Sequence, residues 1–84
     1  MAEQIVIDVE TLYAATGAAK LVELPEYERQ VRALAGMGNE IVLTGQGPIW
    51  LYLRLAHALH GKVVKLSYDS PVTGTLLIFD HSPY

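Results

Sequence analysis

The sequence contains no cysteine in its 84 residues. This absence excludes disulfide bonds, thiolate metal sites and a cysteine nucleophile. The chain also lacks an apolar run long enough to cross a membrane, and its acidic, polar start has none of the basic residues that open a secretory signal. We therefore expect a cytoplasmic protein that does not enter a membrane.

Basic side chains are scarce: six lysines and arginines stand against nine aspartates and glutamates, and the formal net charge is −3. A protein that binds duplex DNA or long RNA needs a basic surface that neutralises many phosphates. We therefore expect no such partner. A small anion held by backbone amides and a few local cations remains compatible with this charge.

The length of the chain predicts one α/β domain over residues 1–84. A chain of this size buries only about 60–65% of its unfolded surface. Apolar residues make up 51% of the sequence, which is more than one small core can hide. We therefore expect copies of the chain to associate.

Strand and helix patterns alternate along the chain and end in a pair of strands. The expected strands are Gln4–Val9, Ile41–Leu43, Val63–Tyr68 and Thr75–Phe79, and the expected helices are Pro25–Ala35 and Pro48–His60. Residues 69–74 have turn composition, so the last two strands should form a hairpin. This order predicts an α/β layer fold with a mostly parallel sheet and an antiparallel C-terminal hairpin.

The segment from Glu10 to Glu23 has no single interpretation. Residues 11–15 fit one helical turn and Gly17 fits a break, while residues 20–24 fit either a short strand or the approach to a helix.

The two expected helices differ in their apolar faces. One buried stripe is expected on the first helix, formed by Tyr27, Val31, Leu34 and Ala35. The second helix is apolar nearly all round. One of its faces should pack on the sheet, and the other is a candidate subunit interface.

The stretch from Glu40 to His60 has the pattern of a buried strand, a glycine-rich turn and a helix that opens on a proline. The glycines of residues 44–47 permit positive φ angles and close approach of a ligand. Pro48 is suited to the first turn of a helix, whose free amides and dipole favour a phosphate or carboxylate. The alternative is that the glycines only make a tight connection.

Two groups of polar residues are expected at opposite rims of the sheet. Because ligands bind at the carboxyl ends of parallel strands, Thr44, Gln46 and Asp69 should converge on one rim. His57 and His60, three residues apart near the end of the second helix, should lie at the other rim, and His81 after the antiparallel strand could join them. Only two neighbouring copies in a head-to-tail contact would bring both groups into one site.

The histidines also have simpler interpretations. A histidine at the end of a helix is favoured by the helix dipole, or it can be satisfied within a subunit interface. His81 taken alone is typical of a solvated tail residue.

A resemblance to a known family rests on four stretches. They are Thr44–Leu51 with its Gly-x-Gly-Pro-Ile-Trp-Leu core, Leu55–His60, the pair Tyr68-Asp69, and Gly74 followed by a strand that ends in Asp80-His81-Ser82. Together they resemble the small manganese-dependent ring nucleases of type III CRISPR systems. Those enzymes degrade the second messenger cyclic tetra-adenylate and so switch off the antiviral response. The resemblance runs from about Glu40 to Ser82, half of the chain.

The resemblance implies a small Rossmann-like fold, distantly related to cyclic-nucleotide sensor domains, that works as a homodimer. Two dimers are expected to hold the cyclic ligand head to tail in a ligand-bridged tetramer. His60 and Asp69 map onto the catalytic positions, with His57 nearby. The residues expected to hold the ligand are Thr44, Gly45, Gln46, Gly47, Pro48, Ser70 and His81. Asp69 and His60 are also the expected ligands of Mn²⁺.

The chain departs from the family pattern at two places. Glutamine stands at Gln46, and Ser70-Pro71 follows Asp69, where an arginine is expected in each case. An arginine grips a phosphate with two charge-assisted hydrogen bonds, whereas a glutamine offers a neutral donor.

The leading hypothesis is a metal-assisted ring nuclease in which the ligand's own 2′-hydroxyl attacks the adjacent phosphorus. His60 would then act as general base or acid, and Asp69 would orient that histidine or hold Mn²⁺. The alternative is a non-catalytic module that binds or senses a cyclic oligoadenylate. A third reading, which needs no nucleotide, is a structural oligomerisation domain.

Overall fold

The computed structural model describes residues 3–81. Its elements in chain order are β1 (Gln4–Asp8), the 3₁₀ turns η1 (Val9–Leu12) and η2 (Leu21–Glu23), α1 (Leu24–Ala35), β2 (Glu40–Thr44), α2 (Ile49–Leu59), β3 (Lys65–Ser70) and β4 (Gly74–Asp80). Ser82, part of the family resemblance, lies outside the described residues.

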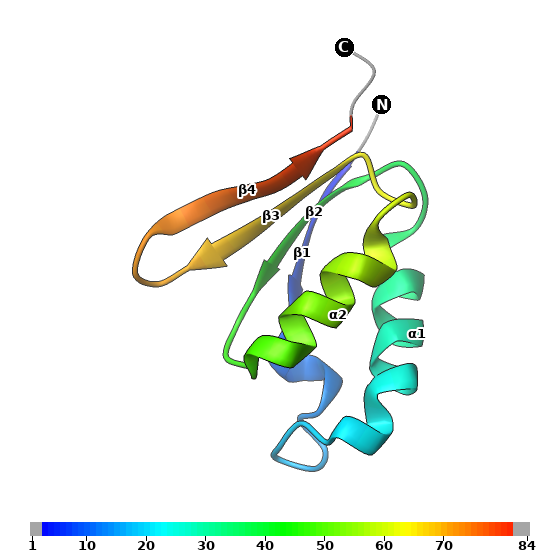
Figure 1. Cartoon of the computed structure of the whole chain (residues 1–84), viewed down its shortest axis with the longest axis vertical. Coiled ribbons are helices and arrows are strands. Elements are labelled where there is room, and N and C mark those ends of the chain that lie inside the picture. The colour runs from blue at the N-terminus through cyan, green and yellow to red at the C-terminus, as the bar shows by residue number, and fades with distance from the viewer. Residues whose placement is uncertain (1–2, 82–84) are drawn as a thin grey trace.

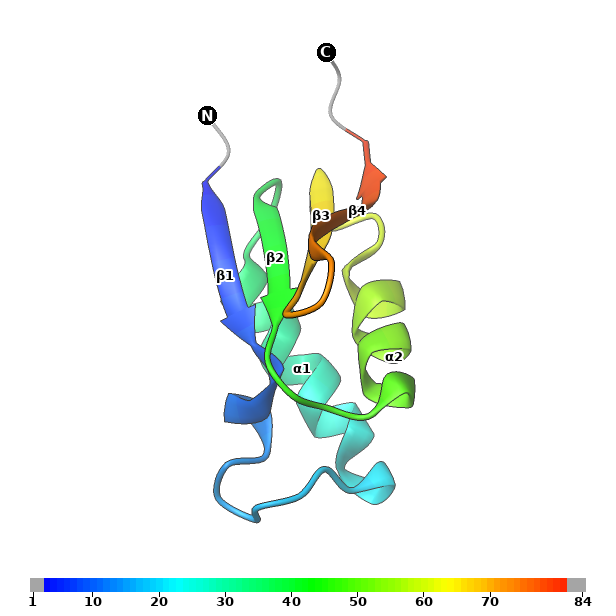
Figure 2. The same ribbon diagram turned by 90° about the vertical axis from the view of Figure 1, so that its left-hand side faces the viewer.

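The four strands form one sheet in the order β1-β2-β3-β4. β1, β2 and β3 are parallel, and β4 returns antiparallel beside β3. Each parallel crossover passes through a helix, and because such crossovers are right-handed and step in one direction, both helices lie on the same face of the sheet (Figures 1 and 2). The predicted α/β layer fold with a mostly parallel sheet and an antiparallel C-terminal hairpin is therefore confirmed.

The core lies between the two helices and the sheet face that they cover. Its fully buried large side chains are Val9, Val31, Ile41, Leu51, Leu55, Leu59 and Leu66. β2 was expected to be buried on both faces, and Ile41, Val42 and Leu43 are indeed all buried. Val42 points to the face without helices and is covered there by its neighbours in the adjacent strands, since it pairs with Val6 and Ser67.

Several element boundaries differ from those predicted. Val9 leaves the first strand and opens η1. The hairpin is longer than its turn composition indicated, because Asp69 and Ser70 still pair with Thr75 and Gly74. Pro48 is the extended N-cap of α2 and does not lie in its first turn, with ψ at 154°.

The buried face of α1 includes two residues that were not expected, Leu24 and Glu28, and omits one that was. Leu34 is 52% exposed, because it lies on the flank of the stripe that Leu24, Val31 and Ala35 define. Glu28 is buried instead. Its Oε1 accepts a hydrogen bond from Nη2 of Arg54 at 3.3 Å, which ties α1 to α2.

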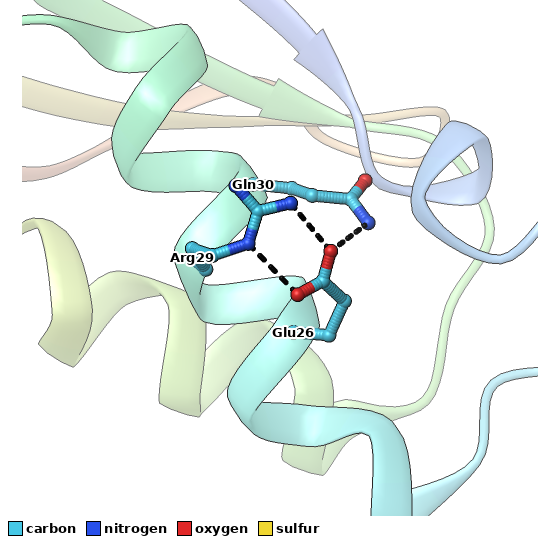
Figure 3. A network of polar contacts seen from close by, with 3 residues as sticks. All are labelled: Glu26, Arg29 and Gln30. Atoms are coloured by element: carbon cyan, nitrogen blue, oxygen red, sulfur yellow. Dashed lines mark hydrogen bonds and ion pairs between the residues drawn. The ribbon is translucent and has the colours of Figure 1, made fainter.

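The exposed side of α1 carries a small polar network (Figure 3). Arg29 donates to both carboxylate oxygens of Glu26, at 2.8 Å from Nε and 2.5 Å from Nη2, and Gln30 Nε2 donates at 3.2 Å. These donors lower the pKa of Glu26 to about 2. The network supports the first turn of the helix, where an acidic side chain also favours the dipole.

The connector between β1 and α1, residues 9–23, is made of turns. Asp8 caps η1 by accepting a hydrogen bond from the amide of Glu10 at 2.9 Å. The second half leads into α1 through η2, so the approach to a helix, and not a short strand, is the outcome. No helix among residues 3–81 is long and apolar enough to cross a membrane.

Candidate functional site

The carboxyl ends of β1, β2 and β3 form the first candidate region, which we call the carboxyl rim. Asp8 pairs with Thr44 in the sheet, so these two side chains lie side by side at the ends of their strands. Thr44 Oγ1 donates a weak hydrogen bond to the backbone oxygen of Asp69 at 3.4 Å. The expected convergence of Thr44 and Asp69 is therefore present.

The glycine turn, Thr44–Gly47, leaves the carboxyl rim and enters α2. Gly45 has a φ of +98°, and a Cβ atom there would lie 2.0 Å from Oδ1 of Asp8. A Cβ at Gly47 would lie 3.0 Å from Cγ2 of Val9. Gly45 is needed because the turn passes close against β1, and a side chain at Gly47 would require Val9 to shift by a few tenths of an ångström. The glycines therefore do make a tight connection.

Two tyrosines that the sequence analysis did not single out hold this turn. The hydroxyl of Tyr52 donates to the backbone oxygen of Gly45, and the hydroxyl of Tyr13 donates to that of Gln46. Burial raises the pKa of Tyr52 to about 12, and neighbouring Tyr68 contributes. Helical side chains lean towards the N-terminus of their helix, a signal that could have linked Tyr52 to the preceding turn.

The turn presents backbone donors to the surface. Within residues 3–81, the amides of Gln46 and Gly47 donate to no protein acceptor. The helix dipole of α2 adds positive potential at the same place, since Pro48 caps its N-terminus. The arrangement can therefore hold a phosphate or carboxylate oxygen.

The charged side chains around the turn are acidic, whereas the free amides and the helix dipole favour an anion. Asp8, Glu10 and Asp69 are exposed at the carboxyl rim. The ion pairs among residues 3–81 join Arg29 to Glu26, Arg54 to Glu28 and Lys65 to Glu40, all away from the turn. An anion at the turn would rely on backbone amides and would meet repulsion from these carboxylates.

Ser70 is the last residue of β3, and Pro71 follows it in the turn to β4. Ser70 Oγ accepts hydrogen bonds from the amides of Val72 at 3.1 Å and Thr73 at 3.4 Å. The hydroxyl oxygen of this expected ligand-binding residue is therefore engaged within the hairpin.

The second candidate region is the histidine end, formed by His57, His60 and His81 at the far end of α2. His60 is the C-cap of α2, and its ring packs edge-to-face on Phe79 and His81 with centroid distances of 5.2 and 5.0 Å. The amide of His81 donates to the backbone oxygen of Val64 at 2.6 Å. His81 thus joins His60 as expected, while His57 is exposed one turn earlier on the helix.

The carboxyl rim and the histidine end lie at opposite ends of the sheet (Figure 1). Asp80, next to His81, pairs with Lys65 at the start of β3, and Asp69 lies four residues further along that strand. Four strand residues span about 13 Å. Within residues 3–81, no three His, Asp or Glu side chains are grouped to hold a metal. Asp69 and His60 of a single copy therefore do not fit one Mn²⁺ ion.

An apolar groove of about 490 Å³ runs from the glycine turn along α2 and the hairpin. It is lined mainly by Ile49, Tyr52, Leu53, Ala56, Pro71 and Ile78. Ile49 is 79% exposed and Leu53 66%, on the face of α2 that the sequence marked as a candidate subunit interface.

Comparison with known families supplies the decisive observation on identity. The family model for CRISPR-associated protein (Cas_csx3) matches residues 19–84. The chain belongs to the Cas_csx3 family. CRISPR association, one part of the expectation from the sequence, is thereby confirmed. The Cas_csx3 match includes the glycine turn, Asp69 and the three histidines but leaves out β1 and Tyr13. Neither the search of curated proteins nor that of solved structures finds a match.

Proposed function

We propose that this Cas_csx3 protein is a ring nuclease that cleaves a cyclic oligoadenylate, most simply cyclic tetra-adenylate, and so switches off type III CRISPR signalling. The observation that carries the proposal is the glycine turn at the start of α2, whose two free amides suit the phosphates of such a ligand. The family membership supplies the CRISPR context.

The reaction needs no nucleophile from the protein. The ligand's 2′-hydroxyl attacks the adjacent phosphorus, its proton passes to a base, and the 5′-oxygen leaves with a proton from an acid. His60 is suited to the proton transfers because an imidazole can both donate and accept a proton. The glycine turn aligns the phosphate and stabilises charge that develops on its oxygens.

The site requires more than one copy of the chain, because His60 and the glycine turn lie at opposite ends of α2. We propose that the histidine end of one copy faces the carboxyl rim of the next, with the cyclic ligand between them. Any Mn²⁺ ion would likewise need donors from two copies, for example Asp69 of one and His60 of the other.

The apolar groove is the surface that we propose for a homodimer. β4 is an edge strand with an exposed row of residues that includes Ile78, and Ile49 and Leu53 of α2 are exposed in the same groove. A two-fold interface uses the same patch on both copies. Since the groove begins at the glycine turn, such a dimer would place two turns near its axis, where both could contact one cyclic ligand.

The dimer surface has a direct test. Leu53→Glu should convert the dimer to a monomer in light scattering, because it places a charge in the apolar groove. Val22→Glu is the matched control, since Val22 is 81% exposed on η2 and away from the groove. A Leu53→Glu protein that remains dimeric would contradict this choice of surface.

The activity is tested by incubating the purified protein with radiolabelled cyclic tri-, tetra- and hexa-adenylate, with Mn²⁺ or with EDTA. We expect metal-dependent linearisation of one ring that is lost in His60→Ala. Cleavage that persists in single turnovers of His60→Ala would remove His60 from the mechanism.

A non-catalytic sensor is the second candidate function. It is favoured by the acidic surroundings of the turn and by Gln46, which places a neutral amide where an arginine was expected. Tight binding of a ring with no product after long incubation with Mn²⁺ would select this function over the nuclease.

A further inference from the structure

Two tyrosine hydroxyls hold consecutive carbonyl groups of the glycine turn. Tyr52 extends from the first turn of α2 and donates to the oxygen of Gly45. Tyr13 extends from the end of η1 and donates to the oxygen of Gln46. The Tyr52 contact spans 7 positions of the sequence and the Tyr13 contact spans 33.

We propose that Tyr13 and Tyr52 are positioning residues that fix the two free amides of the glycine turn for a phosphate of the ligand. This inference rests on the proposed function for its ligand. The fixed geometry of the turn itself is a property of the free protein, so it can be tested separately.

Peptide geometry connects the hydroxyls to the amides. In a trans peptide the N–H of one residue points opposite to the C=O of the residue before it. The structure contains no cis peptide among residues 3–81. The hydrogen bond to the oxygen of Gly45 therefore directs the N–H of Gln46 away from Tyr52, and the hydrogen bond to the oxygen of Gln46 directs the N–H of Gly47 away from Tyr13. Neither of these amides has an acceptor within residues 3–81.

Each tyrosine ring is itself held by another tyrosine. Tyr13 packs edge-to-face on Tyr27 at a centroid distance of 6.3 Å, and Tyr27 is buried and accepts a hydrogen bond from the amide of Lys20 at 3.1 Å. Tyr52 packs edge-to-face on Tyr68 at 4.9 Å. Support of this kind restricts the rings, so each hydroxyl reaches its carbonyl with little loss of conformational freedom.

Both hydroxyls remain donors over the physiological range. Burial, with contributions from Glu10 and Asp8, raises the pKa of Tyr13, and burial raises that of Tyr52 to about 12. The effect of removing either hydroxyl should therefore be constant between pH 6 and 9. If a side chain that titrates in this range held the phosphate instead, the effect of removing it would change with pH.

The first experiment measures the affinity of cyclic tetra-adenylate for Tyr13→Phe, Tyr52→Phe and the double variant. Phenylalanine keeps each ring and removes only the hydroxyl. Tyr68→Phe is the matched control, because its hydroxyl has no hydrogen-bond partner within residues 3–81. We expect each single variant to weaken binding about three- to tenfold, the scale of one lost hydrogen bond, and Tyr68→Phe to bind like the wild type.

The second experiment examines the free protein by ¹⁵N relaxation. We expect lower order parameters at the amides of Gln46 and Gly47 in Tyr13→Phe and Tyr52→Phe, with the amides of β2 unchanged. A general loss of stability would instead affect both sets, so the measurement separates positioning from folding. It is made well below the melting temperature of each variant.

The outcomes distinguish the two levels of the proposal. Weaker binding together with mobile turn amides supports it. Unchanged affinity in both single variants, when the wild type binds the ring, overturns it. If the wild type binds no ring, the proposed function fails. The relaxation data then decide alone whether the tyrosines fix the turn. Rigid amides of Gln46 and Gly47 in both variants would show that the tyrosines do not fix it.

Discussion

The two ends of α2 are built in different ways. At its start, the glycine turn is held by two tyrosine hydroxyls and packs against Asp8. At its end, the ring of His60 packs edge-to-face on half-buried Phe79 and on exposed His81. The first end fixes backbone donors in place, as binding an anion requires, whereas the second leaves imidazoles accessible, as proton transfer requires.

In the ring nuclease that we propose, this difference means that one copy of the chain would hold two incomplete halves of the site. Neither half supplies both a phosphate-binding turn and a titrating base. Association of copies is a way to complete the site without a longer chain.

The largest predicted effect concerns sharing of the site between copies. His60→Ala and Asp69→Asn should each lower ring cleavage more than about hundredfold. An equal mixture of the two variants should recover about a quarter of wild-type activity, because random head-to-tail pairing joins an intact His60 to an intact Asp69 in one junction of four. The measurement is the rate of product formation on a gel.

A matched control tests whether the recovered activity depends on an intact His60. His60→Ala mixed with the double variant His60→Ala/Asp69→Asn contains no intact His60 and should remain inactive. If the first mixture is as inactive as the control, both residues act within one copy, and the site is not shared between copies.

The second prediction concerns the backbone of the glycine turn. Gly45→Ala should lower the free energy of unfolding by more than about 2 kcal/mol, since it adds a clash with Asp8 to a strained positive φ. It should also weaken ligand binding at least tenfold. Gly38→Ala is the control at the other end of the sheet, with a φ of +71° and no atom within 4 Å of the added Cβ.

Gly38→Ala should cost only about 1–2 kcal/mol from backbone strain and leave binding unchanged. Denaturant unfolding and ligand titration measure the two quantities. Equal losses of binding in both variants would indicate a general loss of stability and no special role for the turn.

The sequence predicted the parts of this fold that local patterns determine. The apolar run of β2, the glycine turn and the start of α2 follow from residue types at short spacing, as does the pairing of the hairpin. The location of Thr44 and Asp69 at one rim follows from the rule for parallel strands. The boundaries of the hairpin were less accurate, because Asp69 and Ser70 have turn composition but are held by pairing with β4.

Contacts between residues far apart in the sequence could not be predicted from local patterns. Tyr13 lies in a segment without a clear pattern, and its hydroxyl reaches Gln46 only once β1 and β2 are adjacent. The close approach of Asp8 to Gly45 likewise depends on strand register. Glu28 is buried because Arg54 from the other helix meets it, which periodicity along α1 alone does not indicate.

The third prediction uses the pKa of Tyr52. Its pKa is about 12 in the folded protein, against an ordinary value of 10.0. The folded state therefore holds this proton more tightly, so the contribution to stability is complete below pH 10 and is lost as the pH rises through 12.

The stability of the wild type relative to Tyr52→Phe should accordingly fall by about 1 kcal/mol over this range, a value reduced for screening at a half-buried site. Denaturant unfolding at pH 8, 10 and 11.5 measures the difference. No change in that difference would mean that the phenol is solvated in the folded state, which would also weaken the case for its hydrogen bond to the turn.

The smallest predicted effect tests the electrostatic contrast between amides and carboxylates at the carboxyl rim. Asp8→Asn removes one negative charge next to Gly45, while the asparagine oxygen can still accept the hydrogen bond from the amide of Glu10. Binding of cyclic tetra-adenylate should tighten about threefold at low salt, and the gain should vanish near 1 M salt, where the Debye length is about 3 Å. Glu40→Gln, at the opposite end of β2, should leave affinity unchanged. Weaker binding by Asp8→Asn in the presence of Mn²⁺, but not in EDTA, would instead identify the carboxylate as a cation ligand and reverse its assigned role at this rim.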